Sequence, residues 1–327
     1  MAALQAHYDC DPGQDDAIAL LYALGSPKID IRSLSVVGGN VDVRQCAKNA
    51  LQILELAGRG DIPVYTGAEK PLARPLVSLP EVFGETGMAG GEDLPLPQNA
   101  PRNMVPAQDF KTIASAPILV ATGPLTNLAL QIQNDPAFPQ QIEELFIMGG
   151  CPFPEPVWQR MGNYKPDGAS DYAEYNFACD PEAAKIVFRA GFKKITLVGL
   201  NVTRAVLYNS RVEAALRGTK NVAGLRAAAI LSTVGEDDVQ DYGPLRETPD
   251  DPVRALHDVI AMAAVDAPEL FEFVTVPLRI VADPLPAPAG QSLIDAENYD
   301  HPSVRVAKTI DRNGFLRRLV DNIGGIK

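Results

Sequence analysis

Short apolar segments alternate with longer helix-like segments along most of this chain. The apolar segments are rich in β-branched residues and end at glycine, as buried strands often do. A short first strand is predicted just before residue 9. Further strands are predicted at 31–37, 62–65, 117–121, 144–148 and 194–200. The predicted helices lie at 17–24, 42–58, 107–115, 125–134 and 180–190. This order predicts an α/β fold with a mostly parallel sheet.

The C-terminal part differs from this pattern. Two predicted strands, 274–281 and 291–295, surround a proline-rich linker, and 311–323 is predicted to be an amphipathic helix. We interpret this part as an appendage on the same domain. Residues 1–327 are therefore expected to form a single domain, which is within the range of α/β folds.

The predicted strand ends carry the polar residues with the strongest chemical signal. Ligands of open α/β sheets bind at the carboxyl ends of the strands. Residues 9–16 read Asp-Cys-Asp-Pro-Gly-Gln-Asp-Asp, so four carboxylates fall in one turn that bends at Pro-Gly. Crowded carboxylates repel one another, and Ca²⁺ or Mg²⁺ selects such oxygen-rich turns. A metal-free alternative is that Asp15 or Asp16 only stabilises a helix N-terminus.

Composition narrows the class of partner. The formal net charge of −12 argues against a nucleic-acid partner, whose backbone is also negative. The four cysteines lack zinc-type spacing, and reduced buried thiols fit a cytoplasmic protein. No signal peptide is visible, and no apolar stretch is long enough for a membrane helix.

Further motifs follow the acidic turn in a fixed order. They lie at 38–40 (Gly-Gly-Asn), 120–127 (Val-Ala-Thr-Gly-Pro-Leu-Thr-Asn), 148–150 (Met-Gly-Gly), 173–176 (Ala-Glu-Tyr-Asn), 180–184 (Asp-Pro-Glu-Ala-Ala) and 257–258 (His-Asp). With the acidic turn, this series resembles the inosine–uridine preferring nucleoside hydrolases. The resemblance covers residues 9 to 258.

The resemblance implies a Rossmann-like nucleoside hydrolase fold with a tightly bound Ca²⁺. It implies hydrolysis of the N-glycosidic bond of a small-molecule ribonucleoside, and a homodimer or homotetramer. The implied metal ligands are Asp11, Asp16, Asp258 and the backbone carbonyl of Thr122. The implied ribose ligands are Asp15, Asn40, Asn163, Glu174 and Asn176.

The same resemblance assigns the chemistry. Asp11 is implied to be the general base for the attacking water, His257 to lie near the leaving base, and Asp9 to support the turn. Carboxylates suit an oxocarbenium-like transition state, and a metal lowers the pKa of a water that it binds. His257 as a general acid and His257 as a residue that only lines the pocket both remain open.

Two segments depart from the family pattern. Phe83 occupies the place of a histidine in a lid segment, where it can stack on a base but cannot hydrogen-bond to it. Residues 164–172 separate Asn163 from Glu174, so Asn163 reaches the ribose only if they loop out. Trp158 is the only tryptophan, which favours a pyrimidine or broad base preference over strict purine use.

Two other function classes are considered. Asp9-x-Asp11 after a strand is similar to the nucleophile and acid of haloacid-dehalogenase-type phosphatases, although the following residues differ from that motif. A non-catalytic nucleoside- or ribose-binding relative would keep the fold without turnover. Asp258 could also be a simple helix cap, and Asn40 a left-handed turn residue.

Overall fold

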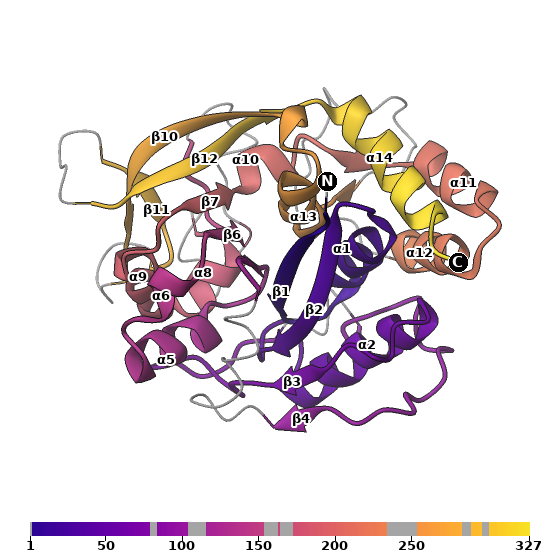
Figure 1. Ribbon diagram of the computed structural model, residues 1–327, viewed down its shortest axis with the longest axis horizontal. Coiled ribbons are helices and arrows are strands. Elements are labelled where there is room, and N and C mark those ends of the chain that lie inside the picture. Colours follow the sequence, from indigo (N-terminus) through magenta and orange to yellow (C-terminus); the bar gives the residue numbers. More distant parts are fainter. Residues whose placement is uncertain are drawn as a thin grey trace.

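A ten-stranded sheet runs through the computed structural model (Figure 1). The structure describes residues 2–78, 84–103, 116–153, 163, 173–233, 254–282, 289–295 and 301–327. The strand order is β11-β10-β12-β7-β6-β5-β1-β2-β3-β4. Its members are β1 Leu4–Cys10, β2 Ile29–Val36, β3 Val64–Thr66, β4 Arg102–Asn103, β5 Ile118–Ala121, β6 Glu144–Met148, β7 Ile195–Val198, β10 Phe271–Ile280, β11 Ser292–Ile294 and β12 Ser303–Ile310.

The pairing is parallel from β4 through β7 to β12, and only β10 runs antiparallel to its neighbours β11 and β12. This confirms the predicted α/β class with a mostly parallel sheet. The C-terminal strands extend the main sheet. The sequence pattern missed β12, in which buried Val304 and Val306 flank half-buried Arg305, so the strand lacks a continuous apolar run.

Helices cover both faces of the sheet. The larger are α1 Gln14–Gly25, α2 Val43–Leu56, α5 Thr126–Asn134, α9 Pro181–Arg189, α11 Ser210–Gly218, α12 Val222–Thr233, α13 Asp258–Asp266 and α14 Arg312–Gly324. Shorter ones are α6 Phe138–Gln141, α8 Tyr175–Cys179, α10 Leu200–Thr203 and the 3-10 helix Pro268–Leu270. A separate hairpin pairs β8 Leu207–Tyr208 with β9 Arg254–Ala255. The predicted helix 107–115 lies outside the described residues.

The core forms two layers because side chains alternate across the strands. In β5, Val120 packs into the core that contains α1, α2, α12 and α13. Leu119 and Ala121 pack into the other core, with α5 and α9. The central strands are buried on both faces, which explains their nearly continuous apolar sequences. Helices α1 and α13 contact each other and are buried along almost their whole length.

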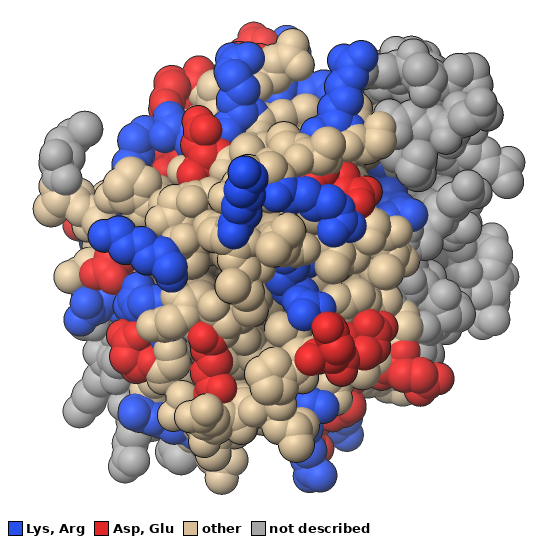
Figure 2. Space-filling view, turned by 90° about the vertical axis from the view of Figure 1, so that its right-hand side faces the viewer, with Lys and Arg blue, Asp and Glu red and all other residues tan. Residues whose placement is uncertain are grey.

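The surface carries charges of both signs. Figure 2 shows lysine and arginine side chains interspersed with aspartate and glutamate on one face of the molecule. On that face the acidic excess of the chain is therefore not gathered into a single patch. No helix in the described ranges is both long and apolar enough to cross a membrane.

Candidate functional site

Three carboxylates meet where two central helices begin. β1 ends at Cys10, the Pro-Gly turn follows, and α1 begins at Gln14. Helix α13 begins at Asp258, far away in the sequence. One carboxylate oxygen from each of Asp15, Asp16 and Asp258 lies within 4.8 Å of the others. Both helix N-termini thus direct their positive dipole ends toward the carboxylates.

Asp11 is held beside this cluster by close backbone packing. A Cβ at Gly39 would lie 2.0 Å from its Oδ2 atom, and one at Gly123 would lie 2.7 Å from its Oδ1 atom. A side chain at either position would therefore displace the Asp11 carboxylate. The backbone N–H of Asn40 donates to Asp11 Oδ2 at 2.8 Å, and the Asn40 side chain donates to the Asp11 carbonyl at 3.0 Å. Asn40 has no positive φ, so a left-handed turn does not explain it.

The acidic cluster is buried and short of compensating charge. Asp11, Asp16 and Asp258 are each at most 3% exposed. Burial raises the pKa of each carboxyl, and neighbouring carboxylates raise it further. Within the described part of the chain, no lysine or arginine forms an ion pair with any of the three. Several buried carboxylate oxygens that lack a positively charged partner fit a hard divalent cation such as Ca²⁺.

Thr122 connects the cluster to the next part of the site. Its hydroxyl donates to Asp16 Oδ1 at 2.7 Å. Its backbone carbonyl, the implied metal ligand, accepts a hydrogen bond from Asn176 Nδ2 at 2.6 Å. A carbonyl oxygen has two lone pairs, so this bond leaves one for a cation.

Glu174 and Asn176 lie at the start of α8, beside the end of β6. Glu174 caps the helix: Oε1 accepts from the N–H of Asn176 at 2.8 Å, and Oε2 accepts from the N–H of Gly150 at 3.0 Å and of Phe177 at 3.1 Å. Burial raises the pKa of Glu174 to about 7, although these bonds and the charge of Arg204 act in the opposite direction. The carboxylate therefore has a structural role at the start of α8, which the sequence did not reveal.

Asn163 lies next to this group despite the separation in sequence. Its Oδ1 atom accepts from the N–H of Tyr175 at 2.7 Å, and its own N–H donates to the carbonyl of Ala173 at 3.1 Å. These two bonds place Asn163 beside the start of α8, next to Glu174. Its contact with a ribose stays a prediction.

His257 immediately precedes Asp258 and is half-buried. Its Nδ1 atom is 2.8 Å from the hydroxyl of the fully buried Thr203, at the end of α10. This contact fixes the ring from the core side. Sequence reasoning missed Thr203, because nothing in the pattern around α10 relates it to a histidine so distant in sequence.

Asp9 lies apart from the acidic cluster. Its carboxylate accepts from the hydroxyl of Ser35 and from Asn127 Nδ2, and the side chain is fully buried. Burial raises its pKa to about 7. His7 bonds Ser33 and Ser35 on the same side of β1. These contacts support the predicted structural role of Asp9 and argue against an exposed aspartyl nucleophile.

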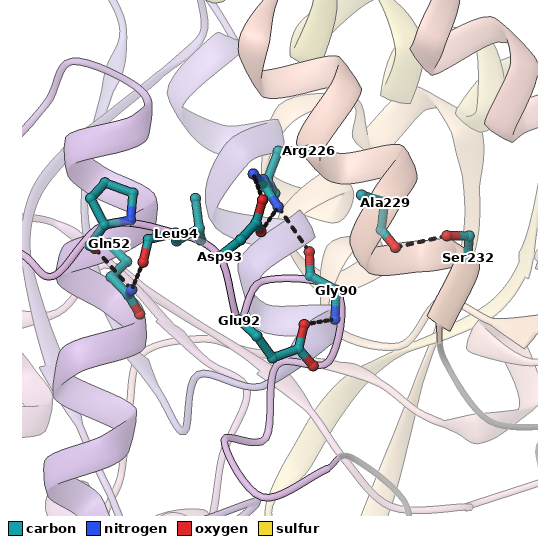
Figure 3. A network of polar contacts seen from close by, with 9 residues as sticks. Gln52, Gly90, Glu92, Asp93, Leu94, Arg226, Ala229 and Ser232 are labelled. Carbon is teal, nitrogen blue, oxygen red and sulfur yellow. Dashed lines mark hydrogen bonds and ion pairs between the residues drawn. The ribbon is translucent and has the colours of Figure 1, made fainter.

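Segment 84–95 is hydrogen-bonded to α12, α2 and α1, and Figure 3 shows its contacts with α12 and α2. Arg226 of α12 binds the Asp93 carboxylate with both terminal nitrogens and also donates to the Gly90 carbonyl at 3.1 Å. Gln52 of α2 donates to the Leu94 carbonyl at 3.1 Å. Gln14, next to Asp15, reaches the Ala89 carbonyl at 3.1 Å. Phe83, just before this segment, lies outside the described residues.

The chain is similar to known proteins in both sequence and fold. The family model "inosine-uridine preferring nucleoside hydrolase" matches residues 6–317. The chain is 34% identical to the pyrimidine-specific ribonucleoside hydrolase RihA of Citrobacter koseri and 33% identical to that of Escherichia coli, covering 98% of each chain in both cases. Among solved structures, a plant nucleoside hydrolase (31% identity) and a purine-preferring ribonucleoside hydrolase from Gardnerella vaginalis (26%) each match with a TM-score of 0.83 over 98% of both chains.

Proposed function

The chain belongs to the inosine–uridine preferring nucleoside hydrolases and is thus an N-glycosyl hydrolase; from this premise we propose that it is a Ca²⁺-dependent ribonucleoside hydrolase that prefers pyrimidine bases. The observation that carries the metal dependence is the meeting of Asp15, Asp16 and Asp258 beside the buried Asp11. The pyrimidine preference rests on the relatives that bear this name.

Asp11, Asp16, Asp258 and the Thr122 carbonyl would hold the cation. Bound Ca²⁺ would supply a Lewis acid that lowers the pKa of a water molecule. Asp11 would take the proton of the attacking water. Its carboxylate is suited to this because the Asn40 N–H and the glycines on both sides leave it a single position.

The ribose is recognised by side chains around the carboxylates. Asp15, Asn40, Asn163, Glu174 and Asn176 offer acceptors and donors for its hydroxyls. Such a site rejects a sugar that lacks a hydroxyl, because the buried polar groups would then lose a partner. Carboxylates near the sugar also stabilise positive charge that develops on the ring during bond cleavage.

His257 would protonate the leaving base. Nδ1 of His257 lies 2.8 Å from the Thr203 hydroxyl, and when that hydroxyl donates the hydrogen bond, the neutral ring carries its proton on Nε2. Protonation matters because an anionic pyrimidine is a poor leaving group. A substrate with an activated leaving group does not need this step.

The test is ribose release from uridine, cytidine, inosine and adenosine, measured with added Ca²⁺ and with a chelator. We expect release that requires Ca²⁺ and is fastest with the pyrimidine nucleosides. Asp11→Asn should abolish release, whereas Asp321→Asn, at an exposed position of α14, should not. Fast release by Asp11→Asn would refute the general-base role. Nucleoside binding by the wild-type protein without any release would instead identify a non-catalytic relative.

A further inference from the structure

The side chain of Tyr8 reaches the acidic cluster from beneath the turn. Tyr8 lies in the middle of β1 and pairs with Leu34 of β2 and Val120 of β5. All three side chains belong to the same apolar core, and Tyr8 is fully buried. A phenylalanine or leucine could fill this space equally well. The only feature that tyrosine adds is a hydroxyl, which needs a partner when it is buried.

That hydroxyl finds its partners at the proposed metal site. The Tyr8 hydroxyl donates to Oδ1 of Asp16 at 3.0 Å, and the Thr122 hydroxyl lies 2.9 Å from the Tyr8 oxygen and 2.7 Å from the same Oδ1 atom. The two hydroxyls thus converge on one carboxylate oxygen. The other oxygen, Oδ2, accepts from the N–H of Gly13 at 3.2 Å and from Asn40 Nδ2 at 3.5 Å.

These contacts fix the orientation of Asp16 before any cation binds. Asp16 lies in the first turn of α1, close to the carboxylates of Asp15 and Asp258, and like charges would otherwise rotate the carboxylates apart. Tyr8 lies in a strand that is paired on both sides, and its side chain is fully buried, so its hydroxyl has little freedom to follow a moving carboxylate. It therefore holds Asp16 in the position from which the carboxylate can bind a cation.

We propose that Tyr8 is a positioning residue for the metal site, which acts through Asp16 together with the Thr122 hydroxyl. This inference rests on the proposed Ca²⁺ site. Groups that orient metal ligands typically change metal affinity by about 10- to 100-fold when they are removed. The effect of Tyr8 should therefore be seen in Ca²⁺ binding by the protein alone, without any substrate.

The chain offers a matched control. Tyr22, on α1, is also fully buried, and its hydroxyl also donates to an aspartate, Asp266 Oδ2, at 2.8 Å. Asp266 ends α13, whereas Asp258 begins it, so the Tyr22 bond lies at the opposite end of the same helix pair. Tyr8→Phe and Tyr22→Phe remove the same atom from the same kind of bond. Only the first should touch the metal site.

The experiment is calorimetric titration of the metal-free protein with CaCl₂, combined with thermal unfolding of each variant. We expect Tyr8→Phe to raise the Kd for Ca²⁺ by at least about 10-fold. Tyr22→Phe should leave this Kd within about twofold of the wild type, because it removes no group near the cluster. The Tm of Tyr22→Phe should nevertheless fall by an amount similar to that of Tyr8→Phe. An unchanged Kd in Tyr8→Phe, or equal weakening in both variants, would overturn the inference.

Thr122→Val provides a second approach. It should also weaken Ca²⁺ binding, and the double variant Tyr8→Phe/Thr122→Val should depart from the sum of the single effects, since both hydroxyls bind one oxygen. Additive effects would overturn the shared action of the two hydroxyls. If the wild-type protein itself binds no Ca²⁺, the metal site and this inference both fail, whereas binding without ribose release would leave the inference standing and refute only the enzymatic proposal.

Discussion

A methyl group added at Gly39 should disable the enzyme by displacing Asp11. The Cβ atom of an alanine would lie 2.0 Å from Asp11 Oδ2, whereas such contacts essentially never fall below 3.0 Å. The carboxylate must therefore withdraw by about 1 Å. It would also lose the 2.8 Å bond from the Asn40 N–H, because that bond ends on the same oxygen.

The expected loss follows from this displacement. Misplacing a reacting group by about 1 Å costs on the order of 100-fold in rate. At 298 K this equals roughly 2.7 kcal/mol of transition-state stabilisation. Overpacking should also lower the free energy of unfolding by about 1–3 kcal/mol, so the variant should fold but melt earlier.

The assay is kcat/KM for uridine with saturating Ca²⁺, measured below the Tm of each variant. Gly218→Ala is the control, because a Cβ there meets no atom within 4 Å. Gly123→Ala, with a contact of 2.7 Å to the other Asp11 oxygen, should cause a smaller loss than Gly39→Ala. Wild-type kcat/KM in a folded Gly39→Ala variant would show that the exact position of Asp11 does not limit the reaction.

Three further outcomes are expected. Chelation should reduce the free energy of unfolding by about 2.7 kcal/mol relative to protein at a Ca²⁺ concentration of about 100 Kd, and an unchanged Tm would contradict a bound metal. His257→Ala should reduce ribose release from uridine by about 10²- to 10⁴-fold yet spare p-nitrophenyl riboside, and Thr203→Val should act in the same direction more weakly; equal losses on both substrates would contradict an acid role. Burial raises the pKa of Asp9 and of Glu174 to about 7 in the folded chain, against about 4 in the unfolded chain, so the metal-free protein should lose stability as pH rises from about 5 to about 7.5. Burial lowers the pKa of His7 to about 3, so His7 by itself makes the protein more stable as pH rises to about 6.5, and it has no further effect above that pH. One histidine opposes two carboxyls. Urea unfolding in chelator should therefore still show a lower free energy of unfolding at about pH 7.5 than at about pH 5.

The fold class and the local shape of the acidic turn could be predicted from neighbouring residues alone. Continuous apolar runs between helices specify a parallel sheet, because only strands buried on both faces need them. The motif at 9–16 is local: a strand, a Pro-Gly bend and a helix start are encoded by adjacent residues, so their chemistry could be read directly. The same holds for the C-terminal strands at 274–281 and 291–295, which the structure places at β10 and β11.

The packing of distant elements shows which side chains lie beside the acidic turn. Asp258 meets Asp15 and Asp16 because α1 and α13 pack side by side, a contact that no local pattern encodes. Tyr8 looks like an ordinary core residue in the sequence, and its hydroxyl gains a role only when β5 brings Thr122 beside it. Sequence periodicity reports which face a side chain occupies, whereas the partner of its polar tip depends on how the elements are assembled.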